Sequence, residues 1–205
     1  MNAPVSVSAP VLVAVIVGGG LLVVATVLAL RTRAAASNFG WMVIAAFSCC
    51  ILGLATALQA GESDGLRASA VQLLAVVLAA AVGILLTPRH EGETAPSQLL
   101  APAARGIAWM ALLGLPPTAG FLAKVMLYRS LLSVGWGSLT WLAMVATAIG
   151  VLPALWALSS PPPLPLKGPR AFLVFMLAAA ILVLGCYPQS ALFLADLAQG
   201  LTKST

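Results

Sequence analysis

The chain has 205 residues, of which 61% are hydrophobic and only 7% charged, and its formal net charge is +5. A soluble domain carries roughly 25% charged residues, so this chain has too few polar groups to cover a globular surface of its own size. These values exclude a cytosolic enzyme, a nucleic-acid-binding domain and a disordered tail.

Six apolar segments are long enough, at about 20 residues, to cross a bilayer as helices. They are long and continuous, which is typical of a helical membrane protein and not of the alternating strands of a membrane β-barrel. We therefore predict an all-α integral membrane protein with about six transmembrane helices in a single domain, residues 1–205. In chain order the predicted helices cover residues 10–30, 39–60, 66–87, 103–134, 139–158 and 171–187, followed by a short interfacial helix over 188–201.

Basic residues are distributed unequally between the two sides of these helices. The side of the first, third and fifth loops carries Arg31, Arg33, Arg89, Arg105, Lys167 and Arg170, and the other side carries Arg67, Arg129 and Lys203. Since loops rich in Lys and Arg face the cytoplasm, the first group is predicted there. Both termini are then predicted on the non-cytoplasmic side.

No cofactor motif accompanies the apolar segments. The sequence contains no Rossmann, P-loop, haem or iron–sulfur pattern, and its three cysteines lie inside apolar runs without metal-ligand spacing. We predict that the chain itself binds no cofactor or metal. Tryptophans near predicted helix ends are expected to anchor the protein at the membrane interface: Trp41, Trp109, Trp136, Trp141 and Trp156.

The fourth segment is unusually long, with a pair of prolines in its middle. As one helix its roughly 30 residues would extend about 45 Å, against an apolar bilayer core of about 30 Å. Pro116 and Pro117 each remove a backbone donor and clash with the preceding turn, so the helix is predicted to break there. Gly114 and Gly120 flank the break and allow tight backbone turns. Broken backbone at membrane depth is tolerated where protein buries it or where it lines a polar cavity, which indicates a functional position. A simple proline kink is the alternative.

Lys124 follows this break by seven residues, about 10 Å along the second half-helix. Its neighbours are apolar, and an ammonium group near mid-membrane costs about 2.5–3.5 kcal/mol on insertion scales. One interpretation is that the side chain extends to the membrane surface. The other is that it faces the bundle interior and water, where desolvation and the positive end of the half-helix disfavour its charged form. Gly120 and Tyr128 share its helix face, the glycine leaving room for water and the hydroxyl offering a partner.

The residues around the break resemble a known signature. Residues 114–124, Gly-Leu-Pro-Pro-Thr-Ala-Gly-Phe-Leu-Ala-Lys, are similar to the G-x-P-P-x-x-G-F-x-x-K pattern of the antiporter-like membrane subunits of respiratory complex I, which are related to Mrp-type cation/proton antiporters and membrane-bound hydrogenases. Residues 184–189 resemble the L-G-x-x-P-Q near the end of subunit N, the quinone-side member. Residues 31–45 resemble a degraded R…S-x-x-H-x-G-Y segment, with Asn38 at the place of the histidine.

This resemblance implies that the chain corresponds to the C-terminal six helices of a fourteen-helix subunit in a bacterial inner membrane or an equivalent energy-transducing membrane. It implies that Lys124 is a proton-relay lysine. Gly114, Pro116, Pro117 and Gly120 would form the helix break, and Thr118, Phe121 and Tyr128 would support it.

The same resemblance implies that the partners are other membrane subunits of a complex-I-like assembly and the lipid bilayer, without nucleic acid. Quinone and redox centres would belong to those other subunits. The acidic partner of Lys124 is expected from a separate chain, because none of the five acidic residues lies at the centre of a predicted helix. Glu62 and Asp64 in particular are predicted in a loop.

Three functions remain open on these residues. The first is a membrane-arm subunit of a proton-translocating NADH-quinone oxidoreductase or related energy-converting complex, with Lys124 in a proton path and no catalysis by the chain alone. The second is a degenerate structural subunit without pumping, motivated by the missing acidic and histidine residues. The third is an independent small transporter that binds an anion at the N-terminus of the second half-helix.

Overall fold

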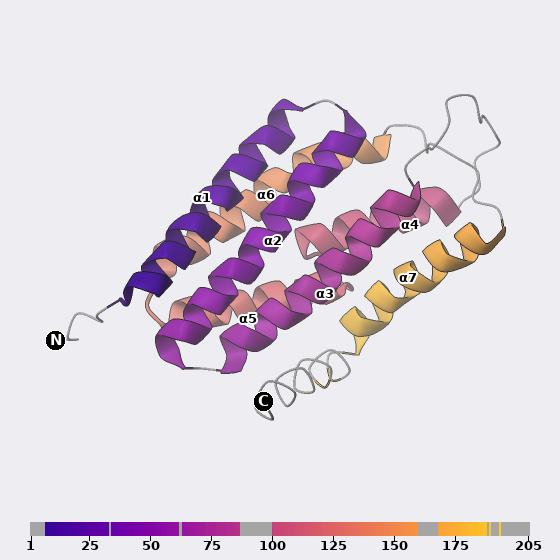
Figure 1. The fold of residues 1–205 in the computed structure, drawn as a ribbon. Coiled ribbons are helices and arrows are strands. Elements are labelled where there is room, and N and C mark those ends of the chain that lie inside the picture. The colour runs from indigo at the N-terminus through magenta and orange to yellow at the C-terminus, as the bar shows by residue number, and fades with distance from the viewer. Residues whose placement is uncertain are drawn as a thin grey trace.

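The computed structural model describes residues 7–32, 34–61, 63–86, 100–159 and 168–187, together with 189 and 193. Every regular element in these ranges is a helix (Figure 1). The helices are α1 (Ala9–Arg31), α2 (Ala35–Ala60), α3 (Ser63–Leu86), α4 (Leu100–Leu113), α5 (Ala119–Ser133), α6 (Gly137–Ser159) and α7 (Gly168–Cys186).

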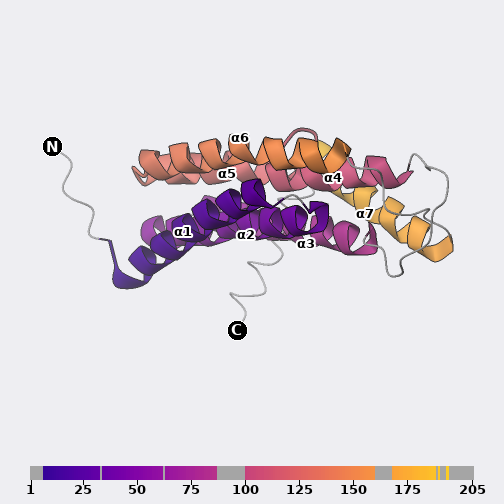
Figure 2. The same cartoon turned by 90° about the horizontal axis from the view of Figure 1, so that it is seen from above.

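The helices form two layers (Figure 2). Helices α1, α2 and α3 make one layer, and α4, α5 and α6 make the other, with α4 and α5 following one another along it. Helix α7 packs against α3, α4 and α5 along the side of the bundle opposite α1. The layers meet through contacts of α1 with α6, of α2 with α4, α5 and α6, and of α3 with α4 and α5. Helix α5 therefore contacts α2 and α3 of the other layer as well as α4 and α6 of its own.

The predicted membrane fold is confirmed. Helices α1, α2, α3, α6 and α7 are long and apolar enough to cross a bilayer, so the chain is an integral membrane protein. Observed helix ends lie within four residues of the predicted ones; α2, for example, begins at Ala35 rather than at residue 39. The predicted interfacial helix over 188–201 falls outside the described residues except at positions 189 and 193.

The orientation of the termini stays a prediction. Four of the basic residues on which it depends lie outside the described ranges: Arg33, Arg89, Lys167 and Lys203. Two of the arginines described near the predicted cytoplasmic end bind backbone carbonyls at helix C-termini. Arg170 Nε donates to Leu85 O at 2.7 Å, and Arg105 Nη2 donates to Leu158 O at 3.2 Å. A cation is stabilised at the negative end of a helix dipole, so Arg170 stabilises the C-terminus of α3 and Arg105 that of α6.

The core consists of two main apolar clusters stacked along the bundle. The first cluster includes Met42, Ala46, Val76, Ala79, Leu112, Leu113, Ala154 and Val174. The second cluster includes Leu22, Ala45, Cys49, Leu52, Ala68, Leu127, Leu131 and Ala143. Alanines are numerous in both clusters, which lets helix backbones approach closely, as is usual for helices that pack within a membrane.

Trp109 belongs to the first cluster, and its predicted role as an interface anchor is wrong. It is only 1% exposed. Its ring packs edge-on against Phe39, with centroids 5.4 Å apart and planes at 85°. Trp109 does lie near a helix end, but α4 ends inside the bundle rather than at the membrane surface. Proximity to a helix end therefore carried no information about depth at this position.

Candidate functional site

Helix α4 ends through a glycine in left-handed conformation. Gly114 has φ +69°. Its N–H donates to Ala111 O at 3.2 Å, and the N–H of Leu115 donates to Met110 O at 2.8 Å. This pair of bonds is the usual capping pattern at a helix C-terminus, where glycine is favoured because it has no Cβ. The two prolines therefore follow a helix that has already been ended by Gly114.

Helix α5 begins directly after Thr118. The Thr118 N–H donates to Leu115 O at 3.1 Å, its hydroxyl donates to the same carbonyl at 2.6 Å, and its own carbonyl accepts from the Phe121 N–H at 3.1 Å. Thr118 thus closes the turn over residues 114–118 from within. The helices on either side have 14 and 15 residues, or about 21 and 22 Å each. Where one broken helix is predicted, two half-length helices meet in mid-bundle.

Two glycines allow backbone to pack against this turn. A Cβ at Gly120 would collide with Ala111 O, and a Cβ at Gly185 of α7 would collide with Pro117 O. The expectation that Gly120 leaves room for water is therefore wrong, because the last turn of α4 fills that space. Gly185, which lies in the second matched sequence segment, packs directly against the first.

The Lys124 side chain lies inside the bundle. It is 6% exposed, and Nζ donates to Leu113 O and to Thr147 Oγ1, each at 2.8 Å. Side chains on a helix point toward its N-terminus, so Lys124 reaches back along α5 as far as the last residue of α4. Its aliphatic part passes beside Gly114, where a Cβ would collide with it. The amine does not extend to the membrane surface.

The electrostatic surroundings of Lys124 differ from those predicted. The sequence suggested that the positive end of α5 disfavours the ammonium. The structure places Nζ on the carbonyl of Leu113, at the negative end of α4. A helix leaves its last carbonyls without partners inside the helix, and a cation is stabilised there. Among the described residues no carboxylate pairs with Lys124, and the ion pairs seen there join Asp64 to Arg67 and Arg129.

Thr147 of α6 is a site residue that the sequence analysis missed. Its hydroxyl donates to Ala143 O at 2.8 Å and accepts from Lys124 Nζ. The Tyr128 hydroxyl lies 3.3 Å from the same oxygen. Since a hydroxyl has one hydrogen, which Thr147 gives to Ala143, Tyr128 is the donor in that contact. Tyr128 therefore meets Lys124 through Thr147. The sequence feature that could have identified Thr147 is its hydroxyl group in the middle of an apolar helix.

Three of the predicted site residues face outward. Phe121 is 42% exposed, and Pro116 and Pro117 are also exposed. The structure thus brings Lys124, Gly114, Thr118 and Gly120 together and leaves the Phe121 ring on the surface of the chain. The prolines lack an N–H, so their exposure leaves no backbone donor unsatisfied at these two residues.

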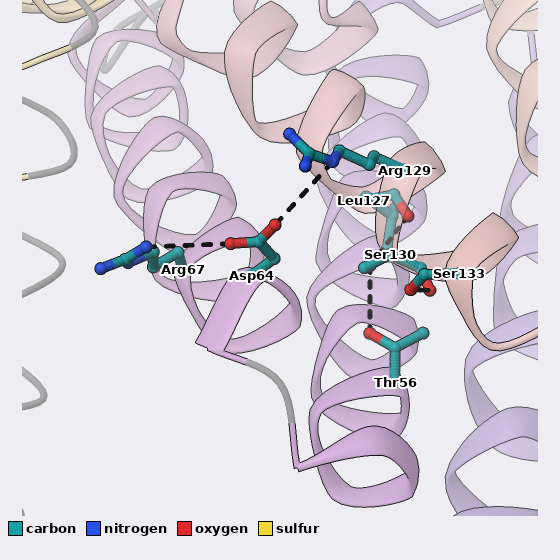
Figure 3. Close-up of polar contacts among 7 residues, drawn as sticks. All are labelled: Thr56, Asp64, Arg67, Leu127, Arg129, Ser130 and Ser133. Atoms are coloured by element: carbon teal, nitrogen blue, oxygen red, sulfur yellow. Dashed lines mark hydrogen bonds and ion pairs between the residues drawn. The ribbon is translucent and has the colours of Figure 1, made fainter.

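A second group of polar contacts lies toward the start of α3 (Figure 3). The hydroxyls of Thr56 and Ser130 are 3.1 Å apart and buried, and each donates to a backbone carbonyl of its own helix, Gly53 O and Leu127 O. Asp64 lies 3.8 Å from Arg67 and 4.0 Å from Arg129. Asp64 is in the first turn of α3, not in a loop as predicted. Ser130 and Lys124 are six residues apart, about 9 Å along α5, so these contacts are separate from the lysine.

Two buried amide side chains have unpartnered polar atoms. Asn38 is 1% exposed and its Oδ1 has no hydrogen-bond partner among the described residues. Gln72 is 2% exposed, and neither Nε2 nor Oε1 has one. An unsatisfied buried polar group costs about 1–3 kcal/mol. Gln72 was not singled out in the sequence, although it interrupts an apolar run of α3.

Comparison with known proteins gives a fold. No family model and no curated protein matches the chain. Among solved structures, a chain of the Mrp complex from Dietzia sp. DQ12-45-1b matches with a TM-score of 0.77 at 19% identity, covering 91% of this chain and 46% of that one. A chain of respiratory complex I from Thermus thermophilus with bound aureothin matches with a TM-score of 0.68 at 24% identity, covering 91% and 45%.

These matches define the class of fold. The chain is an all-helical membrane protein with the fold of about half of a membrane chain of these two complexes. The resemblance to antiporter-like subunits that residues 114–124 suggested is confirmed at the level of the fold. The chain spans somewhat less than half the length of each matched chain.

Proposed function

We propose that this chain is a membrane-arm subunit of a complex-I-like or related energy-converting assembly, in which Lys124 takes up and releases protons. The observation that carries the proposal is the position of its amine. Nζ is buried at the junction of two half-helices and held by Leu113 O and Thr147 Oγ1. An ionisable group inside a membrane bundle is expensive to keep, and such groups mark ion and proton pathways.

The two acceptors suit an amine that changes its protonation state. A neutral amine has two N–H groups, which match Leu113 O and Thr147 Oγ1. An ammonium group has three N–H groups, so protonation adds one hydrogen and leaves both existing bonds in place. The negative end of α4 stabilises the added charge. Uptake and release of a proton therefore require little rearrangement of the helices.

The surface of the break supports a role within an assembly. Leu115, Pro116 and Pro117 are exposed, about 20 Å from the far ends of α4 and α5. In membrane proteins generally, non-helical backbone at this depth is buried in protein or lines a water-filled cavity, and it is not exposed to lipid. Another membrane subunit covering the break would remove that exposure, and the same subunit is a source for the carboxylate that Lys124 lacks among the described residues.

A structural subunit that does not pump is the second candidate. It is favoured by one observation: Asn38, at the place of the family histidine, and Gln72 are buried amides that do not carry protons. On this alternative, Lys124 joins α4 to α5 as a hydrogen-bond donor only.

Replacement of Lys124 distinguishes these candidates. The assembly is isolated in mild detergent with its co-purifying subunits, and proton translocation is followed in inverted membrane vesicles energised with NADH. Lys124→Met keeps the length of the side chain without the amine, and Lys124→Arg keeps a charge that is not released. Both are expected to lower translocation at least tenfold while the subunits still co-purify. Val125→Leu, at an exposed neighbouring position, is the matched control. Unchanged translocation in both variants would favour the structural subunit.

A further inference from the structure

Gln72 lies at the boundary between the two apolar clusters. On α3, Ala68 is one turn before it and belongs to the second cluster, and Val76 is one turn after it and belongs to the first. These three residues share one buried face of the helix. The amide therefore interrupts an otherwise continuous apolar face in the middle of the bundle.

Lys124 lies at the same boundary. Leu127, one turn further along α5, belongs to the second cluster, and Nζ contacts Leu113 of the first cluster. The residues next to Gln72 and Lys124, Val71 and Ala123, pack against each other in a small cluster of their own. Gln72 and Lys124 thus occupy neighbouring helices at one depth.

Gln72 and Lys124 can form more hydrogen bonds than the described residues supply. The Gln72 amide offers two N–H donors and an acceptor oxygen, and none of them has a partner among the described residues. Lys124 has two acceptors for the three hydrogens of an ammonium group. A ligand that satisfies both residues must accept and donate hydrogen bonds and be small enough to lie between packed helices. Water has these properties, and buried water typically makes about three hydrogen bonds to such groups.

We propose that Gln72 is a positioning residue that holds water between α3 and α5 beside Lys124. The hydration does not depend on the proposed function, but its use in proton exchange rests on it. In that exchange an N–H bond of the Lys124 ammonium breaks, and its electron pair stays on nitrogen. The proton forms an O–H bond with the water, and the resulting hydronium gives one of its protons to a further water. Gln72 orients the accepting water and does not itself take up the proton.

Water at position 72 is tested by the reactivity of a substituted cysteine. Cys49, Cys50 and Cys186 are first replaced by alanine in the assembled complex, and the Gln72→Cys variant is then treated with a small methanethiosulfonate reagent, which reacts with thiols in contact with water. The matched control is Val76→Cys, which is one turn away, similarly buried and within the first apolar cluster. We expect the thiol of the Gln72→Cys variant to react at least tenfold faster than that of the Val76→Cys variant. Equal rates would overturn the proposal.

A direct observation covers the case in which the Gln72→Cys variant does not assemble. An electron cryo-microscopy map of the unmodified complex that resolves other membrane-embedded waters is expected to show one within hydrogen-bond distance of the Gln72 amide. An empty position would overturn the proposal. Failure of the proposed function has a different signature: the Gln72→Cys thiol is labelled or the water is visible, while translocation is unchanged in Lys124→Met.

The part of Gln72 in proton exchange is tested by Gln72→Leu, which preserves most of the side-chain volume and removes the amide. If the water carries the proton, translocation falls at least tenfold in the protein with Lys124. The same change has no further effect in the Lys124→Met background. A Gln72→Leu variant that translocates at the normal rate would remove the positioning role and leave only the hydration.

Discussion

The amine of Lys124 on α5 donates a hydrogen bond of 2.8 Å to the carbonyl of Leu113, the last residue of α4. Lys124 therefore links α4 to α5. The break between these two half-helices leaves free the carbonyl that Lys124 binds. The contact provides one free carbonyl of α4 with a donor, in place of the intrahelical bond that an uninterrupted helix would supply. Because the same nitrogen also contacts Thr147 on α6, the three helices meet at one atom.

Thr147 is expected to matter more than its ordinary appearance in the sequence indicates. Thr147→Val keeps the shape of the side chain but removes the acceptor shared by Lys124 and Tyr128. Leaving buried donors without a partner costs about 1–3 kcal/mol, so we expect a loss of that size in unfolding free energy, measured in detergent. Thr147→Ser retains the acceptor and should restore most of it. The control is Thr140→Val, since the Thr140 hydroxyl bonds to Trp136 O of the preceding turn; an equal loss there would contradict the shared-acceptor role.

Gly185 is expected to be sensitive because of the backbone it contacts. Gly185→Ala places a methyl group against Pro117 O and the Thr118 backbone. Overpacking of this kind costs typically about 1–3 kcal/mol, and the resulting shift would move the turn that leads into α5. We expect a lower melting temperature and reduced translocation.

The matched control for this change is Gly20→Ala in α1, where a Cβ meets nothing within 4 Å. Alanine is favoured over glycine inside a helix by about 0.5–1 kcal/mol, so this variant should be as stable as the parent protein or more so. If Gly185→Ala had the same melting temperature and translocation as Gly20→Ala, close packing of α7 against the Pro117–Thr118 backbone would be contradicted.

The parts of this structure that follow from local sequence were predictable. Hydropathy located the helices, and the proline pair located the interruption between α4 and α5, because both effects act over a few residues of one segment. Lys124 was found because a charge in an apolar run is costly wherever it lies. The absence of backbone N–H donors at Pro116 and Pro117 could be read from the sequence without knowing how the rest of the bundle packs.

The remainder of the site depends on which helices become neighbours. Thr147 lies on α6, beside α5 in the same layer, and Gln72 lies on α3 in the other layer, and sequence spacing does not encode which of these helices pack against one another. The role of Gly120 was misassigned for the same reason, since the space beside it is filled by α4 backbone. The burial of Trp109 likewise follows from α4 ending inside the bundle.

Gly114 is expected to control where α4 ends. Its φ of +69° is one that residues with a Cβ adopt at a cost of about 1–2 kcal/mol, and a methyl group there would also collide with the Lys124 side chain. Gly114→Ala should therefore destabilise the protein and displace the amine from Leu113 O. Gly106→Ala, in α4 with open space around it, should be neutral or stabilising. Thermal unfolding of both variants measures the difference; a Gly114→Ala protein as stable as Gly106→Ala would show that the cap does not fix the break.

Asp64 provides the contrasting case of a charge whose removal should have little effect. It lies 3.8 Å from Arg67 and 4.0 Å from Arg129, and the Arg129 side chain is 81% exposed. Exposed ion pairs contribute about 0–1 kcal/mol, so Asp64→Asn should change stability by no more than that. Because Asp64 is held near the start of α3, beside Arg129 and more than one turn of α5 from Lys124, the variant should also translocate protons normally. A loss of translocation comparable to that of Lys124→Met, in an assembly of normal composition, would instead make Asp64 the acidic group that exchanges protons with the lysine, and the carboxylate would then belong to this chain rather than to a neighbouring subunit.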